Sequence, residues 1–194
     1  KQIDIRATAD DGPDAQTYIN GYVSPEREYL QLDIQGRGTY IDFMHSFTES
    51  FLSNISGHAH GDVRLSGPLS TLQLTGQLIV DGYATVAPLG TTYTLRGDTV
   101  LFIPDEIELH RVPVYDKYDN TAYLIGGIHH QNLTNLTFDL AVDTDNLLAY
   151  DFSSFGDQSF YGTVFAAGNV AIQGRPGRVT IDCNVTPQKN TVFT

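Results

Sequence analysis

The stretch GDVRLSG, at residues 61–67, decides the fold, because the same pattern occurs three more times in the chain. The other copies are GQLIVDG (76–82), GTVFAAG (162–168) and GNVAIQG (168–174), each with glycine at both ends and apolar residues at its third and fifth positions. Side chains two apart along a strand point to the same face, so each copy predicts a short strand with one apolar side. Glycine at the ends permits a turn, a bulge or a close backbone approach. The repetition predicts one long sheet with a continuous apolar face.

The composition indicates an all-β chain. Among 194 residues there are 18 glycines, 11 tyrosines and 10 phenylalanines, with no tryptophan and one methionine. Aromatic and β-branched residues with frequent glycine are typical of strands joined by turns. No linker or change of composition interrupts the chain, so we expect a single domain over residues 1–194, an antiparallel meander with one polar and one apolar face. Because alternation is already under way at Ile3, we expect this domain to be a fragment of a longer β-rich protein.

The charge of the chain excludes some partners. The net charge is −12, and the 11 lysines and arginines are scattered singly. Binding to nucleic acid needs a basic stripe that releases counterions from phosphates, and adhesion to an anionic membrane surface needs similar basic clusters. We therefore expect neither.

Alternating apolar residues predict strands along most of the chain. An early strand contains Leu30, Leu32 and Ile34 and is expected to end at residues 36–38 (GRG). Alternation is regular again over residues 136–142, and residues 143–146 (DTDN) are expected to break it. Residues 115–120 (YDKYDN) predict a polar hairpin turn.

In one segment the spacing of the apolar residues changes from two, as in a strand, to three and four, as in a helix. Thr39 with Asp42 resembles an N-terminal helix cap, and Gly57 suits a position just after a helix. The spacing of three and four predicts an amphipathic helix at about residues 40–55, lying on the apolar face of the sheet. The alternative is a helix that binds an outside partner. The apolar residues that recur along one side of this predicted helix are Tyr40, Phe43, Met44, Phe47, Phe51 and Ile55.

No catalytic or metal-binding pattern stands out. His58 and His60 share a strand face, but no third ligand has recognisable spacing, so we expect no metal and no cofactor. Residues 116–120 and 143–146 resemble pieces of a calcium loop, but they lack its glycine and its final glutamate. No nucleophile elbow, phosphate-binding loop or zinc-protease motif occurs, so we expect no enzyme. The single cysteine, Cys183, alternates with apolar residues and is expected to be a small buried side chain.

From about Leu30 to Val192 the order of these features resembles the C-terminal region of the TamB family, the translocation and assembly module subunits related to AsmA-like lipid-transfer proteins. The resemblance depends on the segment leading into residues 55–57 (ISG), on the glycine-bounded copies, and on residues 90–93 (GTTY). It continues through 122–129 (AYLIGGIH) and 160–162 (FYG). It is the ordered series, rather than any one phrase, that is specific.

The resemblance implies a long antiparallel sheet curled into a U-shaped apolar trough, called a β-taco. It also implies a periplasmic location, an inner-membrane anchor outside this fragment, and an outer-membrane β-barrel partner of the TamA type. The implied roles are phospholipid transport between the inner and outer membranes and outer-membrane protein assembly.

We therefore expect the apolar face to solvate phospholipid acyl chains. Two alternatives remain open: a scaffold that receives nascent outer-membrane strands by β-augmentation, and a secreted β-solenoid adhesin or polysaccharide enzyme. The residues predicted to line the groove are Val63, Leu65, Leu72, Leu74, Leu78, Val80, Leu136, Phe138, Leu140, Val164, Val170, Ile172, Val179 and Ile181.

Overall fold

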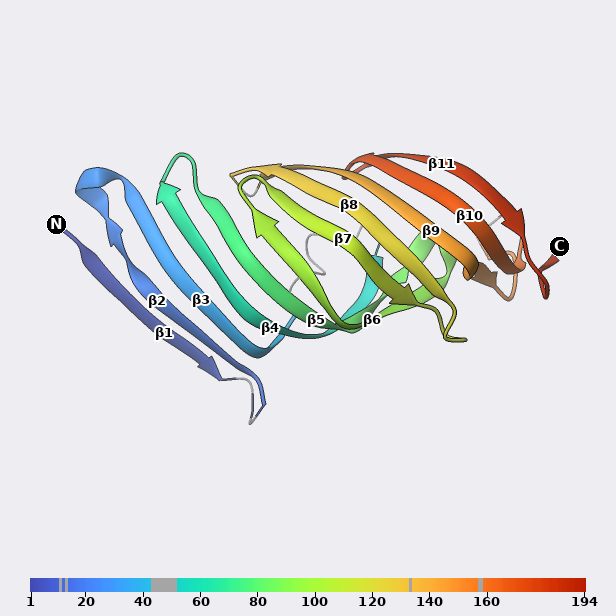
Figure 1. Cartoon of the computed structure of the whole chain (residues 1–194), viewed down its shortest axis with the longest axis horizontal. Helices are drawn as coiled ribbons and strands as arrows, with labels where there is room; N and C mark the ends of the chain where they lie inside the picture. Colours follow the sequence, from blue (N-terminus) through green and yellow to red (C-terminus); the bar gives the residue numbers. More distant parts are fainter. Residues whose placement is uncertain (11, 13, 43–51, 133, 157–158) are drawn as a thin grey trace.

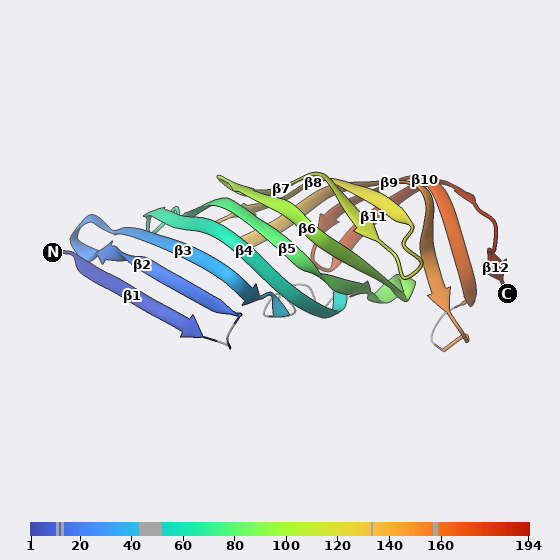
Figure 2. The same ribbon diagram turned by 60° about the horizontal axis from the view of Figure 1, so that its bottom comes forward.

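The structure, a computed structural model, describes residues 1–10, 12, 14–42, 52–132, 134–156 and 159–194. Its strands form one antiparallel sheet, in which each strand from β1 to β11 lies beside its neighbours in chain order. Figures 1 and 2 show one twisted layer, with β1 at one end and β11 at the other. The sheet is open, because β1 and β11 do not pair. The predictions of an all-β chain and of one long antiparallel sheet are confirmed.

Two short 3₁₀ turns connect neighbouring strands at opposite edges of the sheet: η1 (Pro25–Arg27) joins β2 to β3, and η3 (Ala87–Leu89) joins β5 to β6. The strands are β1 (Ile3–Asp10), β2 (Gln16–Ser24), β3 (Tyr29–Tyr40), β4 (Leu52–Pro68), β5 (Gln73–Val86), β6 (Thr91–Ile103), β7 (Glu106–Tyr115), β8 (Thr121–Gln131), β9 (Thr134–Phe152), β10 (Gly162–Arg175), β11 (Arg178–Pro187) and β12 (Val192–Phe193). The last of these pairs with the start of β10.

The repeated glycines lie mostly inside long strands, whereas the sequence predicted that they bound short ones. Both C-terminal copies of the pattern belong to the single strand β10, and residues 61–67 lie within β4. Gly76 has a φ of +130° and Gly168 a φ of +132°, which side chains rarely adopt. A Cβ at Gly168 would also overlap the carbonyl oxygen of Asn184 on the next strand. These glycines therefore allow the backbones of adjacent strands to approach closely.

Gly168→Ala is expected to lower the free energy of unfolding by about 2–4 kcal/mol, because it adds both a strained φ and a backbone overlap. Gly177→Ala is the control: Gly177 has a φ of +81° but nothing lies near its missing Cβ. Its cost is expected to be about 1 kcal/mol. Urea denaturation of both variants measures the difference, and equal costs would show that the close approach contributes nothing.

The predicted helix at about residues 40–55 is wrong at both ends. Tyr40 is the last residue of β3 and pairs with His58, whose ring centroid lies 4.6 Å from that of Tyr40. Ile55 lies in β4, and Gly57 is inside that strand, facing Gly82, rather than capping a helix. Ladder pairing with β5 and close glycine contact thus override the helical period. The middle of the predicted helix, residues 43–51, lies outside the described residues.

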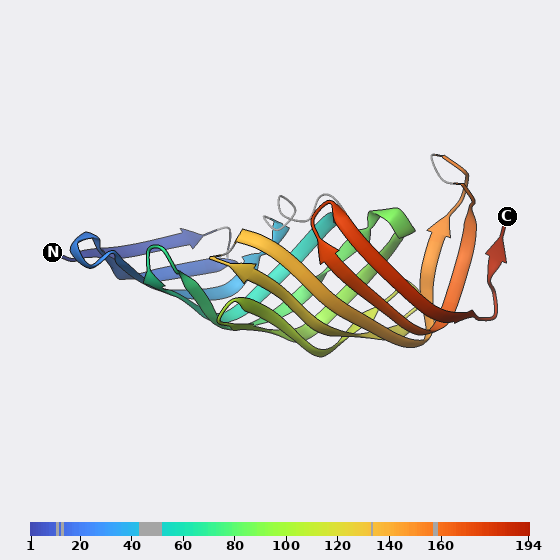
Figure 3. The ribbon, with the colours of Figure 1, turned by 90° about the horizontal axis from the view of Figure 1, so that it is seen from above.

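Two predicted strand ends are bulges instead. β3 continues through residues 36–38, and its register with β4 shifts between Gly36 and Thr39. β9 continues through residues 143–146, where its register with β10 shifts. A bulge absorbs an extra residue while keeping the ladder, so turn-forming residues need not end a strand. Beyond the bulge in β9, the end of β9 and the start of β10 bend out of the line of the rest of the sheet (Figure 3). The end of β9 thereby approaches η3 and β6, and a Cβ at Gly90 would overlap the carbonyl oxygen of Asp151.

Cys183 is exposed, so the prediction that it is buried is wrong. The register does place it on the apolar face, opposite Val170. Every residue of β11 is exposed, because this strand has a neighbour on one side only.

Most of the buried large side chains gather in one corner of the sheet, where the start of β6 meets the end of β9. The Tyr93 hydroxyl donates a hydrogen bond of 2.8 Å to the carbonyl oxygen of Leu148. Leu148 and Thr91 are each 1% exposed. Burial raises the pKa of Tyr93 to about 12. We call this region the closed corner; its other buried members are Val112, Ala122, Leu147, Tyr150, Phe165 and Ala166.

Asp116 organises the β7–β8 turn beside the closed corner. Its carboxylate is buried and accepts hydrogen bonds from the backbone N–H groups of Tyr118 (2.8 Å) and Asn120 (3.0 Å), as well as from the Asn120 side chain (2.9 Å). It also accepts one from the N–H of Leu148 on β9, at 2.8 Å. The hairpin turn predicted at residues 115–120 is confirmed, and one carboxylate joins it to β9.

Asp116→Ala is expected to lower the free energy of unfolding by about 3 kcal/mol or more, because it leaves the buried Leu148 N–H without a partner and frees the turn. Asp182→Ala, which changes an exposed residue of β11, is the control and should lie within about 0.5 kcal/mol of the parent. Chemical denaturation followed by circular dichroism measures both. A cost below about 1 kcal/mol for Asp116→Ala would contradict this role.

Tyr93 is expected to make stability fall at alkaline pH. Its pKa is about 12 in the folded chain and about 10 when unfolded, so its contribution is complete below pH 10 and is lost as the pH rises through 12. The loss amounts to about 2 kcal/mol across this interval. Tyr93→Phe does not titrate, so the stability difference between parent and variant should shrink by that amount between pH 10 and 12. A constant difference would show that Tyr93 is not protected by the fold.

Candidate functional site

The apolar face is continuous across the sheet, because the cross-strand register aligns one position from every strand between β1 and β11. Ile34 pairs with Val63, Phe102 with Ile107, and Ile128 with Phe138. We call this line the central row. Its members in strand order are Ala7, Ile19, Ile34, Val63, Gly76, Phe102, Ile107, Ile128, Phe138, Gly174 and Val179.

Shorter apolar rows flank the central row on the same face. One contains Leu32, Leu65 and Leu74, and another contains Leu140, Ile172 and Ile181. The register therefore brings most of the predicted groove residues onto one face. Those that the ladder places there directly are Val63, Leu65, Leu74, Leu78, Val80, Phe138, Leu140, Val170, Ile172, Val179 and Ile181.

The ladder does not pair the other three predicted groove residues with members of these rows. Leu72 precedes β5 and belongs to no strand. Leu136 is in β9, two residues before Phe138, so alternation puts it on the apolar face at the end of the strand. Val164 pairs with Tyr150 at the border of the closed corner.

The prediction missed part of this face. Phe102, Ile107 and Ile128 lie in the central row, and Val142 links Leu124 to Val170. These residues also alternate with polar ones, so the signal was present. Without the register, however, it was not possible to choose between Val100/Phe102 and Leu101/Ile103 as the inward pairs.

The two faces differ in exposure. Along β9, residues 136–144 alternate without exception between half-buried apolar-face positions and exposed polar-face positions. The same alternation runs through residues 77–84 of β5. The described strands form a single layer, so none of them lies over the apolar face as a second sheet (Figure 2). On β11, at the C-terminal end of the sheet, the apolar side chains are less buried: Val179 is 45% exposed and Ile181 is 55% exposed.

The closed corner limits the apolar face on one side. Tyr93 on β6 bridges to Leu148 on β9, across the ends of β7 and β8. Among the described residues, the face is therefore filled at this corner, whereas the residues of the central row are half-buried or exposed.

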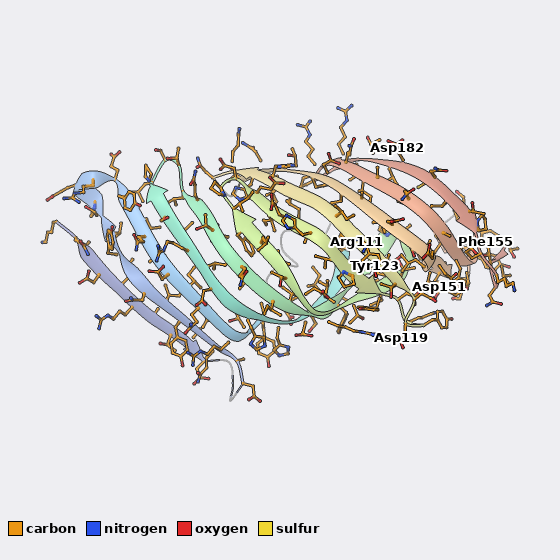
Figure 4. The ribbon with its side chains drawn as sticks, in the orientation of Figure 1. Arg111, Asp119, Tyr123, Asp151, Phe155 and Asp182 are labelled. Atoms are coloured by element: carbon orange, nitrogen blue, oxygen red, sulfur yellow. The ribbon has the colours of Figure 1, made fainter. Side chains whose placement is uncertain are left out.

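The opposite face is polar and carries cross-strand amide–carboxylate pairs. Gln35 donates to Asp62 at 2.9 Å, Asn169 to Asp143 at 3.0 Å, and Gln173 to Asp139 at 3.1 Å. Arg111, at a bulge of β7, stacks over the ring of Tyr123 on β8 at 3.9 Å, as Figure 4 shows. This face has the hydrogen-bonding groups of a solvated surface.

Within the described ranges, no group of three or more His, Cys, Asp and Glu side chains is arranged to hold a metal ion. His58 and His60 share the polar face as predicted, and His60 accepts a hydrogen bond from the N–H of Gly38 at 3.0 Å. Nor does the described part of the chain contain a helix long and apolar enough to cross a membrane.

No family model, no curated protein and no solved structure matches this chain. The resemblance to the TamB family therefore remains a prediction from the residues.

Proposed function

We propose that this chain is a periplasmic segment of a TamB-like envelope protein, and that its sheet forms a U-shaped apolar trough for phospholipid acyl chains. The observation that carries the proposal is the central row, which continues an apolar surface through all strands from β1 to β11. The resemblance of residues 30–192 to the TamB family supports it. An envelope anchor and an outer-membrane β-barrel partner belong to the proposed full-length protein.

The mechanism is solvation rather than catalysis. Each acyl methylene removed from water contributes about 0.8 kcal/mol, so a chain lying along the central row needs no specific polar contact. The row runs across the strands, and each of its positions is an apolar side chain or a glycine. A lipid tail can then move along it without meeting a high barrier, while the headgroup stays in water. The closed corner is already filled by protein side chains and lies outside this path.

Leu78→Asn is expected to reduce the phospholipid bound per purified protein roughly tenfold, because it removes contact with two or so methylenes and introduces an amide into the path. Ile79→Asn is the matched control. Ile79 is the next residue of β5, points to the polar face and is already 42% exposed. Lipid extraction followed by mass spectrometry measures the bound phospholipid, and circular dichroism checks that both variants fold.

Three outcomes separate the candidate functions. Loss of lipid in Leu78→Asn alone supports the trough. Equal amounts in both variants, or no phospholipid above background in the parent, contradicts it. Binding of strand-forming amphipathic peptides with no lipid would instead favour the β-augmentation scaffold.

A further inference from the structure

The polar face has a hollow of about 470 Å³ over β2 to β5. Two rows of polar side chains form its walls: Asn20, Asp33, Arg64 and Thr75 in one, and Tyr18, Gln35 and Asp62 in the other. Between the walls lies the backbone of Ile34, Val63 and Gly76, whose side chains, where present, point to the apolar face. A Cβ at Gly76 would overlap the carbonyl oxygen of Asp62, so the backbones of β4 and β5 lie close together beneath the hollow.

Internal hydrogen bonds hold the walls in place. Arg64 Nε donates to Asp33 Oδ1 at 2.6 Å, and Gln35 donates to Asp62 Oδ1 at 2.9 Å. The Tyr18 hydroxyl donates to Gln16 at 2.5 Å, which fixes the direction of its ring. Among the described residues, the side chains of Asn20 and Thr75 make no hydrogen bond, so they face the hollow with free donors and acceptors.

The chemistry of the lining restricts the ligand. Two carboxylates and one guanidinium leave a net charge of −1, and the guanidinium is already paired, so phosphate, sulfate and carboxylate ligands are repelled. The amide and hydroxyl groups both donate and accept, and the remaining carboxylate oxygens accept, which suits a ligand that is rich in hydroxyl groups. The volume is that of a small-molecule site.

We propose that this hollow binds a neutral glycan, with sugar hydroxyls bridging the two polar walls. The site lies on the face opposite the proposed lipid path, so the two proposals can fail separately. A glycan lying across β2 to β5 would meet a pair of polar side chains on each of β2, β3 and β4 and one on β5, with successive strands about 4.8 Å apart.

Cellotetraose and tetra-N-acetylchitotetraose are the probes, and inorganic phosphate and trigalacturonic acid are the anionic comparisons. Titration of each into the isotopically labelled chain, followed by NMR, is expected to give saturable shifts for a neutral probe at residues 18–20, 33–35, 62–64 and 75–76. Asp62→Asn and Thr75→Val are each expected to weaken binding roughly tenfold. The first replaces an accepting carboxylate oxygen of the wall with a donating amide group, and the second removes a hydroxyl group.

Asp139→Asn is the matched control. Asp139 accepts the same kind of cross-strand bond, from Gln173 at 3.1 Å, on the same face but outside the hollow. It should leave glycan affinity unchanged. Saturation by neither neutral probe, preference for an anionic probe, or equal weakening by Asp62→Asn and Asp139→Asn would each overturn the proposal. Leu78→Asn should leave glycan binding intact, whatever its effect on lipid.

Discussion

Cross-strand register is the constraint on which the rest of this structure depends. The side chains of a strand alternate with a period of two, so a slip of one residue would send every apolar side chain of that strand to the polar face. The central row passes through every strand from β1 to β11 without such a slip, although several ladders contain shifts elsewhere. The bulges lie beside the row, where they change twist without exchanging the faces. Glycines at close backbone contacts, such as Gly76 and Gly168, favour one pairing over its neighbours because a side chain there would collide with the adjacent strand.

A single-layer sheet lacks the packed second layer that stabilises most domains. This chain compensates locally, at the closed corner. There the β7–β8 turn, the end of β9 and the start of β6 meet, and Asp116 and Tyr93 satisfy backbone groups that would otherwise be buried without partners. Elsewhere the apolar side chains shield one another only in part, which is the condition that a surface must meet to accept a mobile apolar ligand.

Sequence alone predicted the strand type, the antiparallel order and most of the apolar face, because alternation is a local signal that survives in each strand. It did not predict strand lengths. Residues 36–38 and 143–146 have turn-forming composition, yet bulges keep them in the ladder, and only the neighbouring strand determines that. The same limit explains why the helix predicted between Tyr40 and Ile55 was wrong at its ends. Tyr40 pairs with His58, and Ile55 lies in β4, which pairs with β5, so sheet formation overrides the helical spacing. The exposure of Cys183 depends on β11 having one neighbour, and the hollow on the polar face depends on four strands at once, so neither could be read from one segment.

Strand order has a consequence for how such a chain changes in length. Each strand from β1 to β11 pairs with the strands that come before and after it in the sequence. Almost all cross-strand pairing is therefore between consecutive strands. A sheet of this kind behaves as a linear array, in which units interact mainly with the next unit. Insertion or deletion of a whole hairpin between β1 and β5 would keep both the direction of the remaining strands and the identity of their faces. The same event between β6 and β9 would pull apart the Tyr93–Leu148 bridge. Variation in length should therefore be tolerated on one side of β6 and resisted on the other.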